Sequence, residues 1–439
     1  MRRGGRLIAA CVGAALFGPA FGAPGATEAA ATPAAAAAVI EQGRYLASAG
    51  DCISCHTQPR HAPYSGGRAL STPFGVIYSA NITPDTATGI GAWSEQQFAR
   101  ALRQGVDADG RHLYPAFPYT AYTLLSDEDV HALYLYLRAL PPVRYTPPSN
   151  ALAFPLGYRA LLAGWKLLYF RDGRYSADRG HSAEWNRGAY LTQALGHCGA
   201  CHTPRNVLGG ERTALALTGG TYLDDIADEV VDDVVTPMDE RTVRPWSAAN
   251  LTPAASGLGA WSLEDIVAYL KTGHSARAGA FGPMSEVVAN STARLTDADL
   301  RSIGVYLKSL PPAAQGPPAP PREALRLSGE VVYTARCGDC HLATGQGVPR
   351  VGNAVPSKTA PPLAGNAALQ SPDPATLINV VLYGAHEADA SARAWPRMSG
   401  FELSVGLDDE AIAALCTYVR SSWGNQAGPV DAAAVARQH

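Results

Sequence analysis

"CISCH" (52–56), "CGACH" (198–202) and "CGDCH" (337–341) are three copies of one pattern in a chain of 439 residues. Together they hold six of its eight cysteines. In every copy two thiols stand three positions apart, and a histidine directly follows the second thiol. The copies lie roughly 140 residues from one another, so each thiol pair stands alone with its own histidine.

C-x-x-C-H is the pattern that attaches a c-type haem. Two thiols about one helical turn apart can form thioethers with the vinyl groups on one porphyrin edge, and the next residue then presents its imidazole to the iron. A structural zinc site normally needs four nitrogen or sulfur ligands, and a disulfide needs no histidine. The sequence therefore predicts three covalently bound haem c groups. The attaching thiols are Cys52, Cys55, Cys198, Cys201, Cys337 and Cys340, and the iron ligands are His56, His202 and His341.

The stretches around the motifs repeat as well, which indicates an array of similar units. "SANITPDTATGIGAWS" (79–94) follows the first motif and parallels "SAANLTPAASGLGAWS" (247–262) after the second. Each unit then ends in a predicted helix, within 125–143, 295–313 and 407–425. Apolar residues at helical spacing predict one buried stripe on each of the first two helices: Val130, Leu133 and Leu137, then Leu300, Ile303 and Leu307.

The ends of these helices also carry local signals. Ser126 and Thr296 are predicted N-caps, with Asp129 and Asp299 as capping-box partners three residues on. Cys416, in the third helix, is predicted to be buried and unreactive.

The predicted fold class is all-α, with three tandem cytochrome c-like domains, each built around one covalent haem. The chain divides into a signal peptide and leader (1–28), domain 1 (37–143), a linker with a candidate interfacial helix (144–180), domain 2 (181–312), a Pro-rich linker (313–324), domain 3 (325–425) and a C-terminal tail (426–439).

The N-terminus is typical of a secretory signal peptide. Arg2, Arg3 and Arg6 precede the apolar run "LIAACVGAALFGPAFGA" (7–23). An uncleaved anchor helix is the alternative, but a proline and several glycines in a short apolar run favour cleavage. Residues 24–36 are expected to form a disordered leader. The signal peptide predicts that the mature protein is exported. No other stretch reaches the roughly 18 apolar residues that a membrane span needs, so the exported protein is expected to be soluble or peripheral.

A haem that carries electrons usually has a methionine opposite its histidine. Met284, in "FGPM" (281–284), and Met398, in "AWPRM" (394–398), are the candidates for the second and third irons. Packed core methionines are the alternative. In the first unit the aligned residue is Phe117, which cannot bind iron. The first iron is then left open, or it is bound by a residue from elsewhere, for which Met238, His112 and His131 are the candidates. The alternative for the two histidines is an ordinary position on the protein surface.

With these motifs in place, the chain resembles the three-haem cytochrome c subunits of periplasmic membrane-bound dehydrogenases. The resemblance covers nearly all of residues 37–425. It rests on "GVIYSANITPDTATGIGAWS" (75–94), "HLYPAFPYTAYT" (112–123), "WNRGAYLTQALGHCGACHTPRN" (185–206), "LKTGHSARAGAFGPMSEVV" (270–288) and "YVRSSWGN" (418–425). It implies axial methionines at the positions of Phe117, Met284 and Met398, and the first is absent here. The acidic insertion at 222–245 is a second departure.

The resemblance implies that the subunit accepts electrons from a catalytic dehydrogenase subunit, relays them from haem to haem and reduces ubiquinone. The partner would be a molybdenum aldehyde dehydrogenase (molybdopterin and iron–sulfur), a quinoprotein alcohol dehydrogenase or a flavoprotein. The "YPAFPY" form of the ligand loop is associated with the molybdenum type. The resemblance also implies a periplasmic location, with peripheral attachment to the outer face of the cytoplasmic membrane. "RALLAGWKLLYF" (159–170) is the candidate interfacial segment, and a linker helix packed on the first two units is its alternative.

Other function classes find less support in the sequence. A net charge of −3 does not suggest the basic face of a nucleic-acid binder. No Ser-His-Asp set or phosphate loop stands out, so no catalytic residue is predicted. The alternative function is a haem enzyme with an open first haem, either peroxidase-like or ligand-binding. The missing methionine favours it, and the lack of an acid–base pair near Phe117 disfavours it. A soluble shuttle is a third interpretation, which three linked haems suit less well.

Overall fold

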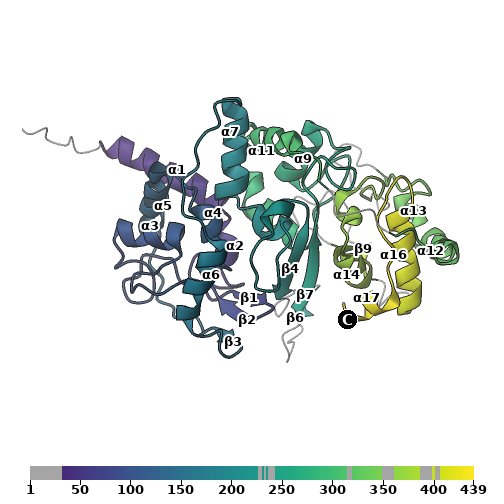
Figure 1. Cartoon of the computed structure of the whole chain (residues 1–439), viewed down its shortest axis with the longest axis horizontal. Helices are drawn as coiled ribbons and strands as arrows, with labels where there is room; N and C mark the ends of the chain where they lie inside the picture. Colours follow the sequence, from purple (N-terminus) through teal and green to yellow (C-terminus); the bar gives the residue numbers. More distant parts are fainter. Residues whose placement is uncertain are drawn as a thin grey trace, which may run out of the picture.

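Three pairs of helices organise the chain in this computed structural model, which describes residues 32–225, 230–231, 234–235, 243–313, 319–348, 360–385, 398–400 and 406–439. The pairs are α1 (Pro33–Ala49) with α5 (Asp127–Ala139), α7 (Ala183–Tyr190) with α11 (Asp297–Ser309), and α12 (Glu323–Arg336) with α16 (Asp409–Ser421). Figure 1 shows them in chain order, from purple at the left to yellow at the right, with the second pair in the middle.

A glycine lies at the contact in each pair. A Cβ added at Gly43, Gly188 or Gly329 would lie 2.0, 1.8 or 2.0 Å from the carbonyl oxygens of Ala132, Ser302 and Ala414, respectively. No side chain fits at such distances, so glycine is what lets the two helix backbones touch. The same device in all three pairs indicates that the three units are built alike.

Shorter helices lie between the two members of each pair along the chain. In the first unit they are α2 (Cys52–His56), α3 (Glu95–Gln104) and α4 (Tyr119–Tyr122). In the second unit they are η2 (Leu191–Leu195), α8 (Gly199–His202), η3 (Thr213–Leu215), α9 (Leu263–Thr272), α10 (Pro283–Asn290) and η4 (Thr292–Arg294), and in the third α13 (Gly338–His341), η5 (Ala367–Gln370) and α14 (Ala375–Tyr383). The linker between units one and two holds η1 (Arg159–Leu161) and α6 (Leu162–Tyr169).

The molecule is rich in helices, but the all-α expectation needs correction because strands are also present. β1 (Ala69–Thr72), β2 (Gly75–Tyr78) and β3 (Ala151–Leu152) form an antiparallel sheet, and β4 (Gly220–Asp225) pairs with β7 (Val243–Ala248). Two shorter pairs are β5 (Val230–Val231) with β6 (Val234–Val235) and β8 (Gly384–Ala385) with β9 (Met398–Ser399). The strands lie in the long loops between the helices, where β-branched residues such as those of "GVIY" (75–78) favour extended backbone.

The predicted N-caps are confirmed, but their predicted capping-box partners are wrong. Ser126 Oγ accepts a hydrogen bond from Asp129 N (3.1 Å), and Thr296 Oγ1 accepts one from Asp299 N (3.2 Å). The two aspartate side chains do not turn back to their caps. Each instead accepts a hydrogen bond from a tyrosine of the other unit, and the hydroxyl of that tyrosine accepts from the backbone N–H of the cap residue (3.2 Å in both cases).

This exchange is reciprocal between units one and two. The Tyr190 hydroxyl donates to Asp129 Oδ2 (2.5 Å), and the Tyr45 hydroxyl donates to Asp299 Oδ2 (2.6 Å). Arg187 adds two further bonds of 2.8 Å to Asp299. The two units therefore hold each other through matching contacts, as a pseudo-symmetric pair.

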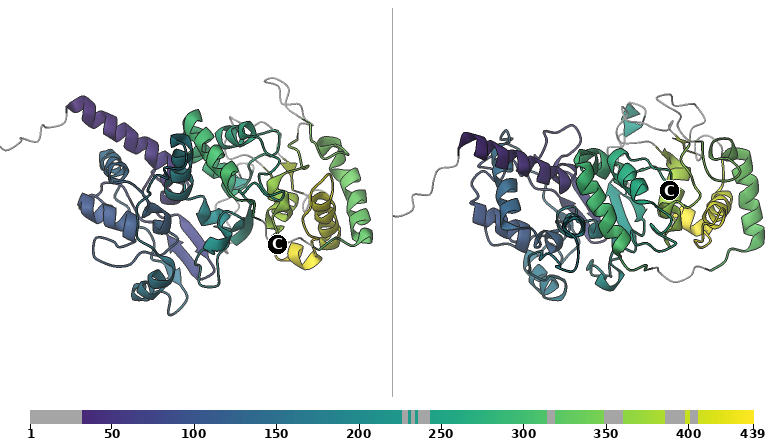
Figure 2. Two further views of the ribbon diagram at one scale, coloured as in Figure 1. Left: turned by 45° about the horizontal axis from the view of Figure 1, so that its top comes forward. Right: turned by 90° about the horizontal axis from the view of Figure 1, so that it is seen from above.

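Among the described residues, the buried apolar side chains form two cores. One is continuous through units one and two and includes Ala367 of unit three, and the other lies within unit three. All six residues of the predicted stripes are buried, and Cys416 is fully buried as predicted. Seen from above in Figure 2, α12 and α16 lie at the far end of the molecule from α1. The first two units thus fold around shared side chains, whereas the third has its own.

Both ends of the described part of the chain are helical. α1 begins at Pro33, because Thr32 caps it by accepting a bond from Ala35 N (3.3 Å) and the alanine run that follows favours helix. The expected disordered leader is therefore helical from residue 33. The tail forms α17 (Ala432–Ala436), with Val435 buried against the third unit.

The predicted signal peptide falls within residues 1–31, outside the described residues. Among the helices of the described ranges, none has the length and hydropathy that crossing a bilayer requires.

Candidate functional site

The three motif histidines share one hydrogen-bonding arrangement. The Nδ1 atoms of His56, His202 and His341 lie 2.7, 2.7 and 3.0 Å from the backbone carbonyl oxygens of Ala80, Ala249 and Pro361, respectively. A carbonyl accepts only from a protonated Nδ1, so Nε2 is left as the nitrogen that can bind a metal. Burial lowers the pKa of all three histidines, which favours the neutral form that a metal needs.

The carbonyl partners were missed in the sequence, although a signal was present. Ala80 and Ala249 each precede an asparagine in the repeated stretches at 79–94 and 247–262. That asparagine holds the loop in place: Asn81 Nδ2 donates to Val143 O and Asn250 Nδ2 to Ala313 O, both at 2.8 Å. The repeat thus positions the carbonyls that orient His56 and His202.

The six motif cysteines lie beside their histidines and are not joined in disulfides. Burial raises the pKa of Cys52, Cys198 and Cys337 to about 12 each. These thiols are therefore protonated and shielded, unlike the low-pKa exposed cysteines that act as nucleophiles. Their place on one turn of helix beside a neutral imidazole is the placement that thioether attachment requires.

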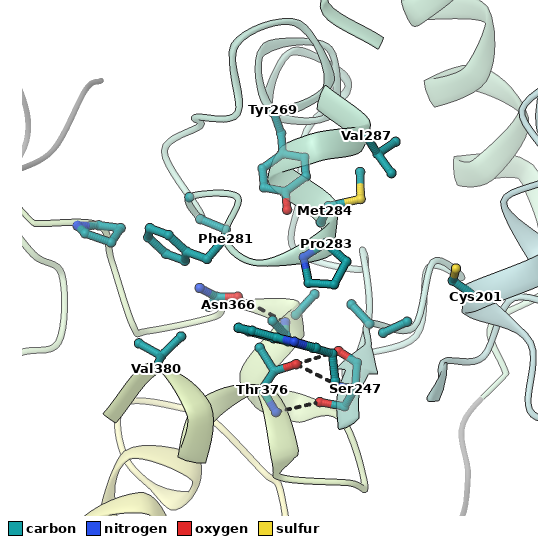
Figure 3. A pocket seen from close by; sticks show the side chains of 18 of the residues that line it. Cys201, Ser247, Tyr269, Phe281, Pro283, Met284, Val287, Asn366, Thr376 and Val380 are labelled. Carbon is teal, nitrogen blue, oxygen red and sulfur yellow. Dashed lines mark hydrogen bonds between the residues drawn. The ribbon is translucent and has the colours of Figure 1, made fainter. Parts of the chain in front are cut away.

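One cavity of about 600 Å³ joins the second and third motifs. Cys198, Cys201, His202 and Met284 line one part of it, and Cys337, Cys340, His341 and Met398 line another. In Figure 3 Met284 lies between Tyr269 and Val287 on one side of the cavity, with Cys201 at the right. The structure thus brings both predicted methionines into the same cavity as the histidines of their units.

The lining of this cavity fits a haem. It is mainly apolar, as a porphyrin requires, yet the indole nitrogens of Trp246 and Trp261 are buried in it without a hydrogen-bond partner. Buried donors of this kind normally have an acceptor, and haem propionates would supply one. The site therefore fits a covalently held haem: the paired thiols would hold it, the oriented imidazole would bind its iron, and the unpaired indole N–H groups would donate to its carboxylates.

Phe117 and Met284 occupy the same place in two equivalent loops. α3 and α9 both end at a glycine with positive φ, Gly105 at 58° and Gly273 at 76°. Leu113 N and Ala280 N then bond to the carbonyls of these glycines at 2.8 Å. Phe117 and Met284 follow four residues later in each loop. The Phe117 ring packs edge-on against Tyr122, with 5.5 Å between ring centroids.

The other candidates for the first iron have different neighbours. His112 Nδ1 lies 3.0 Å from Lys166 Nζ of the linker helix, and His131 Nδ1 lies 2.9 Å from Glu95 Oε1 on the surface. These contacts agree with the alternative interpretation, in which both histidines are ordinary surface residues and not iron ligands. Met238 lies outside the described residues.

The second and third units meet beside the cavity. Thr376 Oγ1 donates to Ser247 O (2.8 Å) and accepts from Ser247 N (2.9 Å), and Asn379 Nδ2 donates to Pro245 O (2.8 Å). Figure 3 shows the threonine and serine side by side beneath the cavity. The first unit also reaches the cavity, through Ser54, Cys55 and Arg68. Side chains from all three motifs therefore border one space.

These features define a c-type cytochrome, and comparison with known proteins agrees. Residues 327–423 match the family model of cytochrome c, whose members bind haem covalently. The chain is 39% identical over 426 residues to the fructose dehydrogenase cytochrome subunit of Gluconobacter japonicus, covering 90% of this chain and 82% of that protein. It is 36% identical over 430 residues to the cytochrome c subunit of the quinone alcohol dehydrogenase of Gluconacetobacter polyoxogenes, covering 94% of this chain and 86% of that protein.

The chain therefore belongs to the family of cytochrome c subunits of membrane-bound dehydrogenases, which transfer electrons within dehydrogenase complexes. A longer relative is a subunit of the nicotinate dehydrogenase of Pseudomonas putida. It is 41% identical over 390 residues, which are 88% of this chain but only 30% of that protein.

Proposed function

We propose that this chain is a three-haem relay that takes electrons from a periplasmic dehydrogenase and delivers them to ubiquinone. The observation that carries the proposal is the threefold repetition of one arrangement: two thiols, and an imidazole whose Nδ1 is held by a backbone carbonyl. Haem c bound at each motif would supply reversible one-electron chemistry. The protein's own part is to hold, orient and separate the three groups.

Each residue of the proposed sites has a defined task. The cysteines Cys52, Cys55, Cys198, Cys201, Cys337 and Cys340 would hold the haems, and His56, His202, His341, Met284 and Met398 would bind the irons. A methionine in the sixth position excludes substrates from the iron and raises the reduction potential. The second and third sites are thereby suited to transfer and closed to ligand chemistry.

The shared cavity supports a proposed order of transfer. It is bordered by Cys55 of the first motif, by the thiols and histidine of the second motif and by those of the third. The second site therefore lies between the other two, as the middle pair of helices does in Figure 1. We infer that electrons pass through the second site in either direction between the outer two.

The partner is proposed to be a catalytic dehydrogenase subunit, of the molybdopterin and iron–sulfur, quinoprotein or flavoprotein type. The names of the fructose, alcohol and nicotinate dehydrogenase relatives support a dehydrogenase partner. A purified complex analysed for molybdenum, flavin and quinone cofactor would select one type.

An exposed apolar surface supports peripheral attachment to the periplasmic side of the membrane. Phe154, Leu167 and Val207 are 85%, 80% and 91% exposed, respectively, and Leu161 and Leu168 are more than half exposed. Leu161, Leu167 and Leu168 lie in η1 and α6, and Val207 lies next to α6, because Trp165 Nε1 donates to Leu208 O (2.9 Å). Phe154 precedes η1 in the same linker. We call Phe154, Leu161, Leu167, Leu168 and Val207 the linker surface. Clustered apolar residues of this kind typically mark an interaction site.

We propose that the two sequence-based alternatives for 159–170 hold together, on opposite faces of one helix. Lys166 Nζ donates to the carbonyls of Gln104 (2.5 Å) and Gly105 (2.8 Å), which packs one face of α6 on the first unit. Leu168 lies two positions on, about 200° around the helix, and therefore points away from that contact. α6 can thus be a packed linker helix and still present an apolar edge to lipid.

The function is tested with the complex purified through a tag on this chain. We expect a catalytic subunit to co-purify and the complex to reduce a ubiquinone analogue when given the substrate of that subunit. A Cys198→Ala/Cys201→Ala variant should lose quinone reduction but keep reduction of a small dye at the catalytic subunit. Quinone reduction at the wild-type rate by this variant would exclude a relay through the second motif.

Phe117 at the methionine position favours a second candidate, a haem enzyme whose first iron is open. Carbon monoxide or cyanide binding by the isolated subunit would support an accessible iron, and peroxidase turnover without a partner would support the enzyme.

A further inference from the structure

We propose that Arg68, from the first unit, is a positioning residue for the ligand helix of the second haem. The inference rests on the proposed function, since it takes Met284 as the sixth ligand of the second iron. It adds that the first unit determines how firmly that methionine is held. Three contacts carry it, and all of them join α10 to the residues around the first motif.

α10 needs support from outside its own unit. It has eight residues and begins after Gly282 at φ 56°, with no side chain capping its first turn. Met284 lies in that first turn, where the backbone amides are not satisfied within the helix. A short, uncapped helix is marginal by itself, so the position of Met284 depends on what the helix packs against.

The first contact is an ion pair across the two units. Arg68 Nη2 lies 2.8 Å from Glu286 Oε2, two residues after Met284. The other terminal nitrogen of Arg68, Nη1, donates to Ser54 O at 2.9 Å. Ser54 stands between the two thiols of the first motif, so one guanidinium joins the first haem-attachment helix directly to the helix that carries Met284.

Two further bonds fix the other end of α10 to the same region. Asn290 Nδ2 donates to Ser54 Oγ (2.9 Å), and Ser291 Oγ donates to Ala49 O (3.3 Å). α10 is therefore held near both ends by unit one. The Arg68 side chain is 19% exposed and that of Glu286 is 41% exposed, so solvent weakens this pair less than it weakens a pair in which both groups are fully exposed.

If the Arg68–Glu286 pair holds α10 in place, Met284 should leave the iron more easily in a variant that lacks the pair than in the wild-type protein. An added ligand such as imidazole must first displace the methionine, and its apparent affinity rises with the fraction of chains in which the methionine is detached. Removing the Arg68–Glu286 pair should raise that fraction. The third site offers an internal comparison, because Met398 lies on β9 in unit three and not on α10.

The test uses the full-length oxidised holoprotein, titrated with imidazole while the red absorption band of methionine-bound ferric haem is followed. Met284→Ala identifies the part of the band that belongs to the second site. In both Arg68→Gln and Glu286→Gln we expect this part to disappear at about fivefold lower imidazole concentration. The haem content and the response of the third site should be unchanged. The double variant should show no further shift, because both changes remove one pair.

Arg44→Gln is the matched control. Arg44 forms an Arg–Glu pair with Glu41 on the exposed side of α1, away from any motif, and its loss should leave the titration unchanged. Wild-type imidazole affinity at the second site in both Arg68→Gln and Glu286→Gln would overturn the positioning role. If Met284→Ala removes no part of the band, the ligand assignment itself fails, which is a different result from failure of the positioning role.

Discussion

Phe117 and Met284 mark the largest difference between the first two sites. Their loops start from equivalent glycines and equivalent backbone bonds, so the difference lies in the side chain and not in the path of the chain. A phenyl ring cannot donate to iron, whereas a thioether can. The first haem should therefore have a lower potential or a different spin state from the other two.

Phe117→Met tests this difference at its source. We expect the potential of one haem to rise by on the order of 100 mV, because a methionine ligand stabilises the reduced iron. Carbon monoxide binding at that haem should be lost. Redox titration and carbon monoxide difference spectra are the measurements. Phe154→Met, at a solvent-facing position, is the control. An unchanged spectrum in Phe117→Met would mean that this loop does not face the iron.

Gly188 is the residue on which the contact between α7 and α11 depends. A Cβ there would lie 1.8 Å from Ser302 O, so Gly188→Ala should force the helices apart and lower the free energy of unfolding by about 1–3 kcal/mol. Gly164→Ala is the matched control, because Gly164 is also in a helix but a Cβ there meets nothing within 4 Å. Denaturant unfolding of the holoprotein measures both. Equal midpoints for the two variants would contradict the close helix contact.

At the scale of elements, features set by residues close together in the sequence could be predicted, whereas features that depend on contacts between distant residues could not. The N-caps Ser126 and Thr296 are correct because a cap is decided within three residues. The roles of Asp129 and Asp299 were missed because their tyrosine partners are 61 and 254 residues away in the chain. Apolar periodicity located the terminal helices, whereas the strands in the haem loops form through pairings that periodicity does not encode.

The residues of the candidate sites also fall into those that the sequence identifies and those that only the fold brings together. The thiols and histidines belong to one contiguous motif, so the sequence was enough to select them as ligands. The carbonyls that orient the histidines are backbone atoms, and in the first two units only the asparagine that follows each of them, Asn81 or Asn250, marks the place in the sequence. The Arg68–Glu286 pair joins residues 218 positions apart, and only the fold brings them together.

α6 gives a prediction at the scale of one element. Leu167→Glu/Leu168→Glu places two charges on the linker surface, where burial in lipid is costly for a carboxylate. We expect binding to vesicles of bacterial lipid to fall at least about tenfold. Val331→Glu on α12 is the control, because Val331 is an exposed apolar residue of another unit, 70% exposed. Sedimentation with vesicles is the assay. Full binding by the α6 variant would remove the linker surface as the attachment site.

At the scale of the whole molecule, the two separate cores predict two folding units. Units one and two share one core, tied by Tyr45 and Tyr190, and unit three has its own. A chain ending at Pro312 should therefore fold cooperatively and keep two covalent haems. A chain ending at Leu140 should be much less stable, because it exposes half of a shared core. Haem content and thermal unfolding are the measurements. A haem-free or aggregated 1–312 chain would contradict this division.

The central claim is that this chain carries electrons on three haems, one at each C-x-x-C-H motif. Coulometric titration of the purified, full-length holoprotein tests it most directly, because it counts the electrons that each chain accepts. We predict three one-electron steps per chain, one of them at lower potential than the other two. A count of one or two electrons per chain would contradict the claim.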